Sequence, residues 1–107
     1  MPMYKPVIIT TTVATLEQAD KIAAVLLEKK LAACVQFENI ISCYKWQGQV
    51  CREEEIRLVI KSARCNYNAV EKVIVQNHDY DCPQVLMQSV SRGFVPYLRW
   101  AKAQLGL

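Results

Sequence analysis

Apolar positions in the first third of the chain predict a strand followed by an amphipathic helix. Residues 7–13 are rich in β-branched side chains, which is typical of a buried strand. Thr15 and Gln18 have the spacing of a capping box, so we expect a helix to begin there and to continue to about Leu31. Its apolar residues recur at intervals of three and four and predict one buried stripe: Ala19, Ile22, Ala23, Leu26 and Leu27.

The middle of the chain predicts a long β-hairpin. Residues 32–46 form the first expected strand, with a break or bulge near Glu38-Asn39, and residues 50–63 form the second. Gln47-Gly48-Gln49 supplies the turn between them. In the second strand apolar residues alternate with mostly charged ones, which predicts one apolar face: Ile56, Leu58 and Ile60. Two consecutive strands joined by so short a turn are expected to be antiparallel neighbours.

The last third predicts a helix, a strand and a terminal helix. Asn66 or Asn68 can cap a helix that runs to about Asn77, residues 84–90 form a strand, and Gly93 opens the last helix. The whole order is therefore β-α-β-β-α-β plus a helix. Right-handed crossovers turn this order into a ferredoxin-like α+β fold, with a four-stranded antiparallel sheet and helices on one face. We expect a single domain over residues 1–107.

This fold leaves part of the sheet without a partner. One face carries no helices, and the hairpin is expected to be longer than the other strands. Its ends would then leave an unpaired edge, which natural proteins cover or pair. We therefore expect the chain to associate with itself through the hairpin.

Composition and charge are typical of a soluble globular protein. The chain is 52% hydrophobic and 21% charged, with a net charge of +3. This charge is too small to indicate nucleic-acid binding, and Glu53-Glu54-Glu55, expected on a solvated strand face, would repel phosphate. Residues 22–27, the longest nearly apolar stretch, are too few to span a membrane, and residues 1–5 lack a signal-peptide hydrophobic region. We therefore expect a cytosolic protein that binds neither nucleic acid nor membrane.

The segment His78-Asp79-Tyr80-Asp81-Cys82-Pro83 carries the strongest candidate chemistry. His78 is the only histidine, and histidine is both a common metal ligand and a group that titrates near neutral pH. It is either a metal ligand or proton-responsive group in a cleft, or a helix C-terminal residue that interacts with the last carbonyls. Cys82 is either a second metal ligand, because thiolates suit Cu(I), or a plain exposed thiol.

The remaining residues indicate neither a disulfide framework nor a catalytic centre. None of the five cysteines lies at C-x-x-C spacing, and their odd number favours free, mostly buried thiols. The chain has no nucleophile beside a histidine in a known motif, and only three glycines. An acylphosphatase-like hydrolase would need an arginine in the loop Val13-Ala14-Thr15, which has none. We therefore expect a protein that is not an enzyme.

Five short segments share the order and spacing of one protein family. They are Leu31-Ala32-Ala33-Cys34-Val35, Tyr44-Lys45-Trp46-Gln47-Gly48, residues 55–62, residues 78–83 and Tyr97-Leu98-Arg99-Trp100. Over residues 7–105 this pattern resembles the CutA family, the divalent-cation tolerance proteins. The resemblance implies a ferredoxin-like subunit in a tight homotrimer with a PII-like architecture. It also implies a cytoplasmic role in the response to copper and other divalent metal ions.

Two positions depart from the family in ways that concern metal binding. Gln84 stands where the family commonly has glutamate, and Thr11 matches a cysteine of some relatives. Of the histidine, cysteine and glutamate proposed as copper ligands in such relatives, only His78 remains. Cys82 and Asp81 are the residues that could compensate, because a hydroxyl and an amide are poor copper ligands.

We also expect a ligand cleft between subunits. Its predicted residues are Lys61, Tyr80, Trp46, Trp100 and Tyr97. Lys61 is either an anion-binding group or a solvated strand lysine, and the aromatic residues either line the cleft or pack in a core or interface. Two functions follow as hypotheses. One is divalent-metal tolerance through weak copper or other metal binding around His78; the other is a PII-like signalling or scaffold trimer that binds a small anion or a partner protein.

Overall fold

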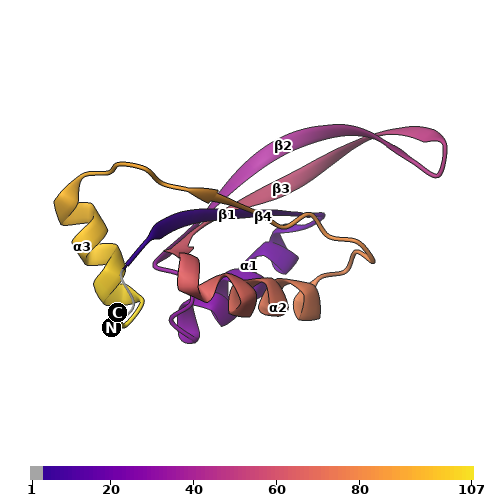
Figure 1. Ribbon diagram of the computed structural model, residues 1–107. Coiled ribbons are helices and arrows are strands. Elements are labelled where there is room, and N and C mark those ends of the chain that lie inside the picture. Colours follow the sequence, from indigo (N-terminus) through magenta and orange to yellow (C-terminus); the bar gives the residue numbers. More distant parts are fainter. Residues whose placement is uncertain (1–3) are drawn as a thin grey trace.

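One antiparallel sheet of four strands forms the centre of the fold, in a computed structural model that describes residues 4–107 (Figure 1). The strands are β1 (Pro6–Val13), β2 (Cys34–Trp46), β3 (Gln49–Ala63) and β4 (Leu86–Ser89), in the sheet order β2-β3-β1-β4. The helices are α1 (Leu16–Glu28), α2 (Tyr67–Asn77) and α3 (Val95–Gln104), and a 3₁₀ turn, η1 (Arg64–Asn66), precedes α2. These elements confirm the predicted ferredoxin-like α+β fold. Residues 1–3 lie outside the described residues. They are part of the N-terminal stretch, residues 1–5, in which the sequence predicts no signal-peptide hydrophobic region.

The hairpin of β2 and β3 is paired along its whole length. All 13 residues of β2 face a partner on β3, so the break or bulge predicted near Glu38-Asn39 is wrong. Glu38 faces Arg57, whose Nε donates a hydrogen bond to Glu38 Oε1 at 3.1 Å. Such an opposite-charge pair stabilises a regular ladder. Gln47 and Gly48, with φ angles of 51° and 77°, form the predicted turn, and positive φ at both residues is the backbone conformation that suits the right-handed twist of the two strands.

Helix α1 begins where the sequence predicts and ends earlier. Thr15 Oγ1 accepts a hydrogen bond from the Gln18 N–H at 3.2 Å, which confirms the predicted N-cap. The helix ends at Glu28 rather than near Leu31, because Lys30 adopts the left-handed conformation at φ 57° and turns the chain back.

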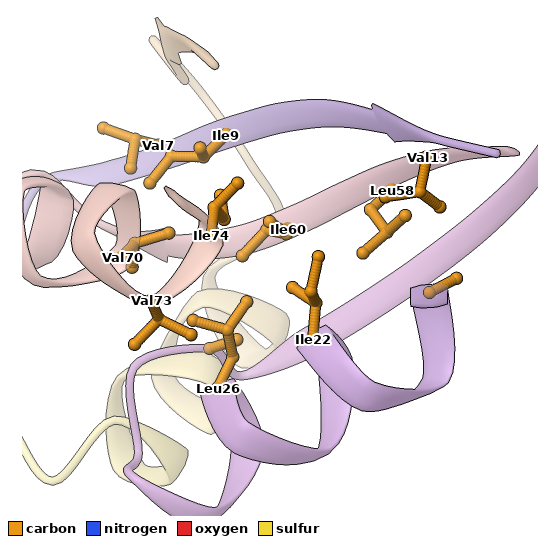
Figure 2. Packing of buried hydrophobic residues seen from close by; sticks show 12 residues of the cluster. Val7, Ile9, Val13, Ile22, Leu26, Leu58, Ile60, Val70, Val73 and Ile74 are labelled. Carbon is orange, nitrogen blue, oxygen red and sulfur yellow. The ribbon is translucent and has the colours of Figure 1, made fainter. Parts of the chain in front are cut away.

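The hydrophobic core lies between the sheet and the helices α1 and α2 (Figure 2). Its buried residues come from alternate positions of β1 and β3 and from one side of each helix: Val7, Ile9, Val13, Ala19, Ile22, Leu26, Leu58, Ile60, Val70, Val73 and Ile74. Leu27, predicted in the buried stripe, is instead 48% exposed. Figure 1 shows both helices on the same side of the sheet. The other side, which we call the open face, carries the intervening residues of β1 and β3: Ile8, Thr10, Thr12, Arg57, Val59 and Lys61.

Helix α3 packs at the end of the sheet opposite the hairpin turn (Figure 1). A small apolar cluster of Ala33, Ala63, Ala101 and Leu105 holds it there. β4 is shorter than the predicted strand over residues 84–90, and α3 starts at Val95 after Phe94 rather than at Gly93. Among residues 4–107, no helix is long and apolar enough to cross a membrane.

Thr11 is a polar residue in the core, and replacing it with valine is expected to stabilise the fold. Its side chain is fully buried, and its hydroxyl has no hydrogen-bond partner among the described residues. An unpaired buried hydroxyl costs about 1–3 kcal/mol, which the isosteric valine avoids. We expect Thr11→Val to raise the free energy of unfolding by about 1 kcal/mol or more in urea denaturation, and Thr10→Val on the open face to change it little. A loss of stability in Thr11→Val would show that the hydroxyl has a partner.

Candidate functional site

A pocket of about 520 Å³ lies between the outer half of the hairpin and the loop that joins α2 to β4. Its lining is polar and aromatic: Thr12, Tyr44, Trp46, Glu53, Glu55, Asp79, Tyr80, Asp81, Cys82 and Gln84. Four of these residues are acidic and none is basic, so we call it the acidic pocket. It brings together three of the predicted site residues, namely Trp46, Tyr80 and Cys82.

His78 anchors the loop that forms one wall of the acidic pocket. Its Nε2 lies 2.8 Å from the backbone oxygen of Thr12, and its Nδ1 lies 3.1 Å from the backbone nitrogen of Tyr80. The Thr12 oxygen can only accept and the Tyr80 N–H can only donate, so the neutral ring carries its proton on Nε2. The ring thus bonds to β1 rather than to the last carbonyls of α2. A metal ion at either ring nitrogen would have to displace one of these two bonds.

Gln18, at the start of α1, fixes the same loop from a second side. Its Oε1 accepts a hydrogen bond from the Asp79 N–H at 2.9 Å, and its Nε2 donates to the Asn77 oxygen at 2.8 Å. Gln18 is buried, and both hydrogen bonds are partly buried. The loop therefore starts from a fixed position relative to both α1 and β1, which sets the place of Tyr80.

Tyr80 and Glu55 join the loop to the hairpin. The Tyr80 hydroxyl donates a hydrogen bond to Glu55 Oε2 at 2.7 Å, and Glu55 is only 8% exposed. Burial, and then the hydrogen bond to Glu55, raise the pKa of Tyr80 well above its ordinary value. The sequence placed Glu55 on a solvated strand face, which is wrong for this member of the acidic triplet. Its hydrogen-bond partner, Tyr80, is 25 positions away, and no local pattern indicates that contact.

The raised pKa of Tyr80 predicts how its contribution to stability changes in alkali. A pKa that is higher in the folded than in the unfolded state stabilises the fold below the unfolded value of about 10, and this contribution is lost as the pH rises further. Tyr80→Phe should therefore be less stable than the parent at neutral pH, and the difference should shrink above about pH 10. Urea denaturation across this range measures it. A difference that stays constant above pH 10 would contradict the raised pKa.

The other three predicted cleft residues lie together near α3, away from the acidic pocket. Lys61 Nζ is 5.9 Å from the centre of the Tyr97 ring, and the Tyr97 and Trp100 ring centres are 5.8 Å apart. Lys61 and Tyr97 also line a small cavity of about 140 Å³. Within one chain, the predicted cleft residues thus form two separate groups. Trp46 and Trp100 are 52% and 47% exposed, so neither packs in the core of this chain.

Comparison with known proteins assigns the chain to a family. The family model described as "CutA1 divalent ion tolerance protein" matches residues 7–104. This chain belongs to the CutA1 family. The divalent-cation tolerance protein CutA of Pectobacterium atrosepticum is 35% identical over 105 residues, which cover 97% of this chain and 96% of that protein.

Solved CutA structures share the whole fold. The crystal structure of divalent ion tolerance protein CutA1 from Ehrlichia chaffeensis has a TM-score of 0.91 at 26% identity and covers 99% of this chain and 100% of its own. The periplasmic divalent cation tolerance protein CutA from Archaeoglobus fulgidus has a TM-score of 0.91 at 31% identity, with coverage of 94% and 98%. The CutA1 fold therefore extends over nearly all of this chain.

In this CutA1 chain, the side chains that could ligate a metal ion are not grouped into a metal-binding cluster among the described residues. Among residues 4–107, no three histidine, cysteine, aspartate or glutamate side chains gather closely enough to hold a metal ion. Thr11, which the sequence was expected to place at the cysteine position of some relatives, is fully buried. The five cysteines are unpaired, and the expectation that most are buried is wrong: Cys34 and Cys51 are partly buried, whereas Cys43, Cys65 and Cys82 are exposed. Cys82 is the exposed thiol that lines the acidic pocket.

Proposed function

We propose that this protein contributes to divalent-cation tolerance as a homotrimer that binds metal ions weakly, at a cleft that a second copy of the chain completes. The match to the CutA1 family over residues 7–104 carries this proposal. The proposed role is binding, without catalysis. The incomplete donor set within one chain is consistent with weak binding, because a metal ion held by one or two side chains keeps most of its water.

The shape of the hairpin supports self-association. The outer edge of β2 has no partner strand within the described residues, and the hairpin extends well beyond α1 and α2 (Figure 1). Large apolar side chains are exposed along it: Ile41 at 56%, Trp46 at 52% and Val50 at 76%. An exposed edge that carries large apolar residues favours pairing with another chain. A second copy would also supply side chains to pockets that one chain leaves open.

Cys82 and His78 are the proposed metal-binding residues. The Cys82 thiol is exposed in the acidic pocket beside Asp81, and a thiolate suits Cu(I) and Zn²⁺. His78 could join it only by giving up its bond from the Tyr80 N–H, which lowers the affinity we expect. Five unpaired cysteines fit a reducing compartment, so we propose the cytosol as the site of action.

Native mass spectrometry of the reduced protein, with and without added Cu(II) or Zn(II), tests both parts of the proposal. We expect a trimer that takes up a whole number of metal ions per subunit. Cys82→Ser and His78→Ala should each reduce uptake, whereas Cys65→Ser, which removes an exposed thiol outside the acidic pocket, should not. A monomer would contradict the assembly. Equal uptake by the parent, Cys82→Ser and His78→Ala would contradict the metal site.

A further inference from the structure

Gln18 is a polar residue on the buried side of α1. It lies one and two turns before Ile22 and Leu26, both of which are fully buried in the core, and it is itself only 7% exposed. An apolar side chain would fill this position without the cost of burying an amide, which a protein offsets by pairing the polar atoms. Gln18 pairs both its oxygen and its nitrogen with backbone groups of the loop after α2. Its polarity therefore stabilises that loop rather than the packing of α1.

The two hydrogen bonds of Gln18 hold the backbone on either side of His78. The Asn77 oxygen, which accepts from Gln18 Nε2 at 2.8 Å, belongs to the peptide unit before His78. The Asp79 N–H, which donates to Gln18 Oε1 at 2.9 Å, belongs to the peptide unit after it. Neither peptide unit can rotate without breaking a bond to Gln18. One side chain of α1 thus fixes the backbone conformation of His78.

The ring of His78 has the arrangement that orients a metal-binding histidine. Such a histidine usually donates its second ring N–H to a carboxylate or a backbone carbonyl, and this bond fixes the tautomer and the direction of the ligand nitrogen. Nε2 of His78 makes a bond of this kind to the Thr12 oxygen of β1 at 2.8 Å. Nδ1 is then the ligand atom. Among residues 4–107, its hydrogen-bond partner is the Tyr80 N–H at 3.1 Å.

We infer that Gln18 is a positioning residue for metal binding by His78. It holds both flanking peptide units, so Nδ1 keeps its place when the Tyr80 N–H gives way to a metal ion. Without Gln18, the loop would have to be ordered at the moment of binding, and the entropy lost would lower the affinity. The inference rests on the proposed metal-binding function and deepens it, because Gln18 lies outside the lining of the acidic pocket.

Zn(II) titration calorimetry of the reduced full-length protein tests the inference. We expect Gln18→Leu to raise the Kd for Zn(II) about tenfold or more, which is the usual effect of removing a group that orients a metal ligand. The matched control is Ile22→Val, one turn further along the buried side of the same helix. It should lower the midpoint of thermal unfolding and yet change the Kd less than about twofold, because it leaves the Gln18 amide in place.

Amide hydrogen exchange measured by NMR tests the role of Gln18 in the absence of a metal ion. The Asp79 amide should exchange slowly in the parent, because it donates to a buried acceptor. Gln18→Leu should speed this exchange at least about tenfold, and Ile22→Val should speed it much less. If Gln18→Leu does not fold, Gln18→Met serves in its place, because its unbranched side chain follows the shape of glutamine more closely.

The outcomes separate this inference from the proposed function. A Zn(II) affinity that Gln18→Leu left unchanged, in a parent that binds Zn(II), would overturn the inference and leave the proposed function intact. Slow Asp79 exchange in Gln18→Leu would overturn it as well, as would equal losses of affinity in Gln18→Leu and Ile22→Val, which would indicate only reduced stability. A parent that bound no Zn(II) would contradict the proposed function, and with it the metal role of Gln18.

Discussion

Replacing Leu58 with alanine is expected to lower the free energy of unfolding by about 2–5 kcal/mol. Leu58 is fully buried on β3 and belongs to the core cluster that β1, β3 and the two covering helices form (Figure 2). Truncation removes apolar surface from the core and leaves a cavity that the surrounding side chains only partly fill. Urea denaturation would show this loss as a lower midpoint with an unchanged slope.

The control for this prediction is the same substitution at an exposed position. Leu27 lies on the outer side of α1 and is 48% exposed. We expect Leu27→Ala to cost less than about 1 kcal/mol, because little buried area is lost. Equal losses from the two substitutions would show that the core does not lie where the sheet and helices place it.

Lysine at both Ile41 and Val50 is expected to convert the proposed trimer into monomers. The two residues project from the same side of the hairpin and are among its most exposed apolar side chains. If the hairpin forms the interface, the substitutions bury two unpaired charges, at a cost of several kcal/mol. We expect the trimer fraction in native mass spectra at micromolar concentration to fall at least about tenfold.

A matched substitution on the helical side separates this effect from a change in net charge. Val75→Lys adds a charge on α2, at a position that is 54% exposed and outside the hairpin. It should leave the trimer intact. A double-lysine hairpin variant that remained trimeric would mean that the subunits associate through another surface.

The sequence predicted the elements whose signals are local. The Thr15 cap, the turn at Gln47-Gly48 and the alternation along β3 each depend on residues close together in the chain. The errors arose where a distant partner changes the outcome. Glu38 looked like a break in β2, but Arg57 across the hairpin neutralises it within a regular ladder. Lys30 adopts a left-handed conformation that glycine usually marks, so its sequence gives no signal for the end of α1.

The candidate site was less predictable than the fold for the same reason. His78, Tyr80 and Cys82 stood out by residue type and by resemblance to the family. Glu55 and Gln18 did not, because their bonds to the loop span 25 and 61 positions. The separation of Lys61, Tyr97 and Trp100 from the acidic pocket also depends on three-dimensional placement that no pattern in one sequence contains.

The pairing of the strands also sets an order of events during folding. β2 and β3 adjoin in sequence and close through a two-residue turn, whereas β1 must find β3 and β4 across intervening helices. The hairpin is therefore expected to form before the core that covers its inner half. In that interval its charged side chains, among them Lys45, Arg52 and Glu54, oppose pairing with other nascent chains. We therefore expect the charges that border the exposed apolar residues of the finished hairpin to limit aggregation of the growing polypeptide.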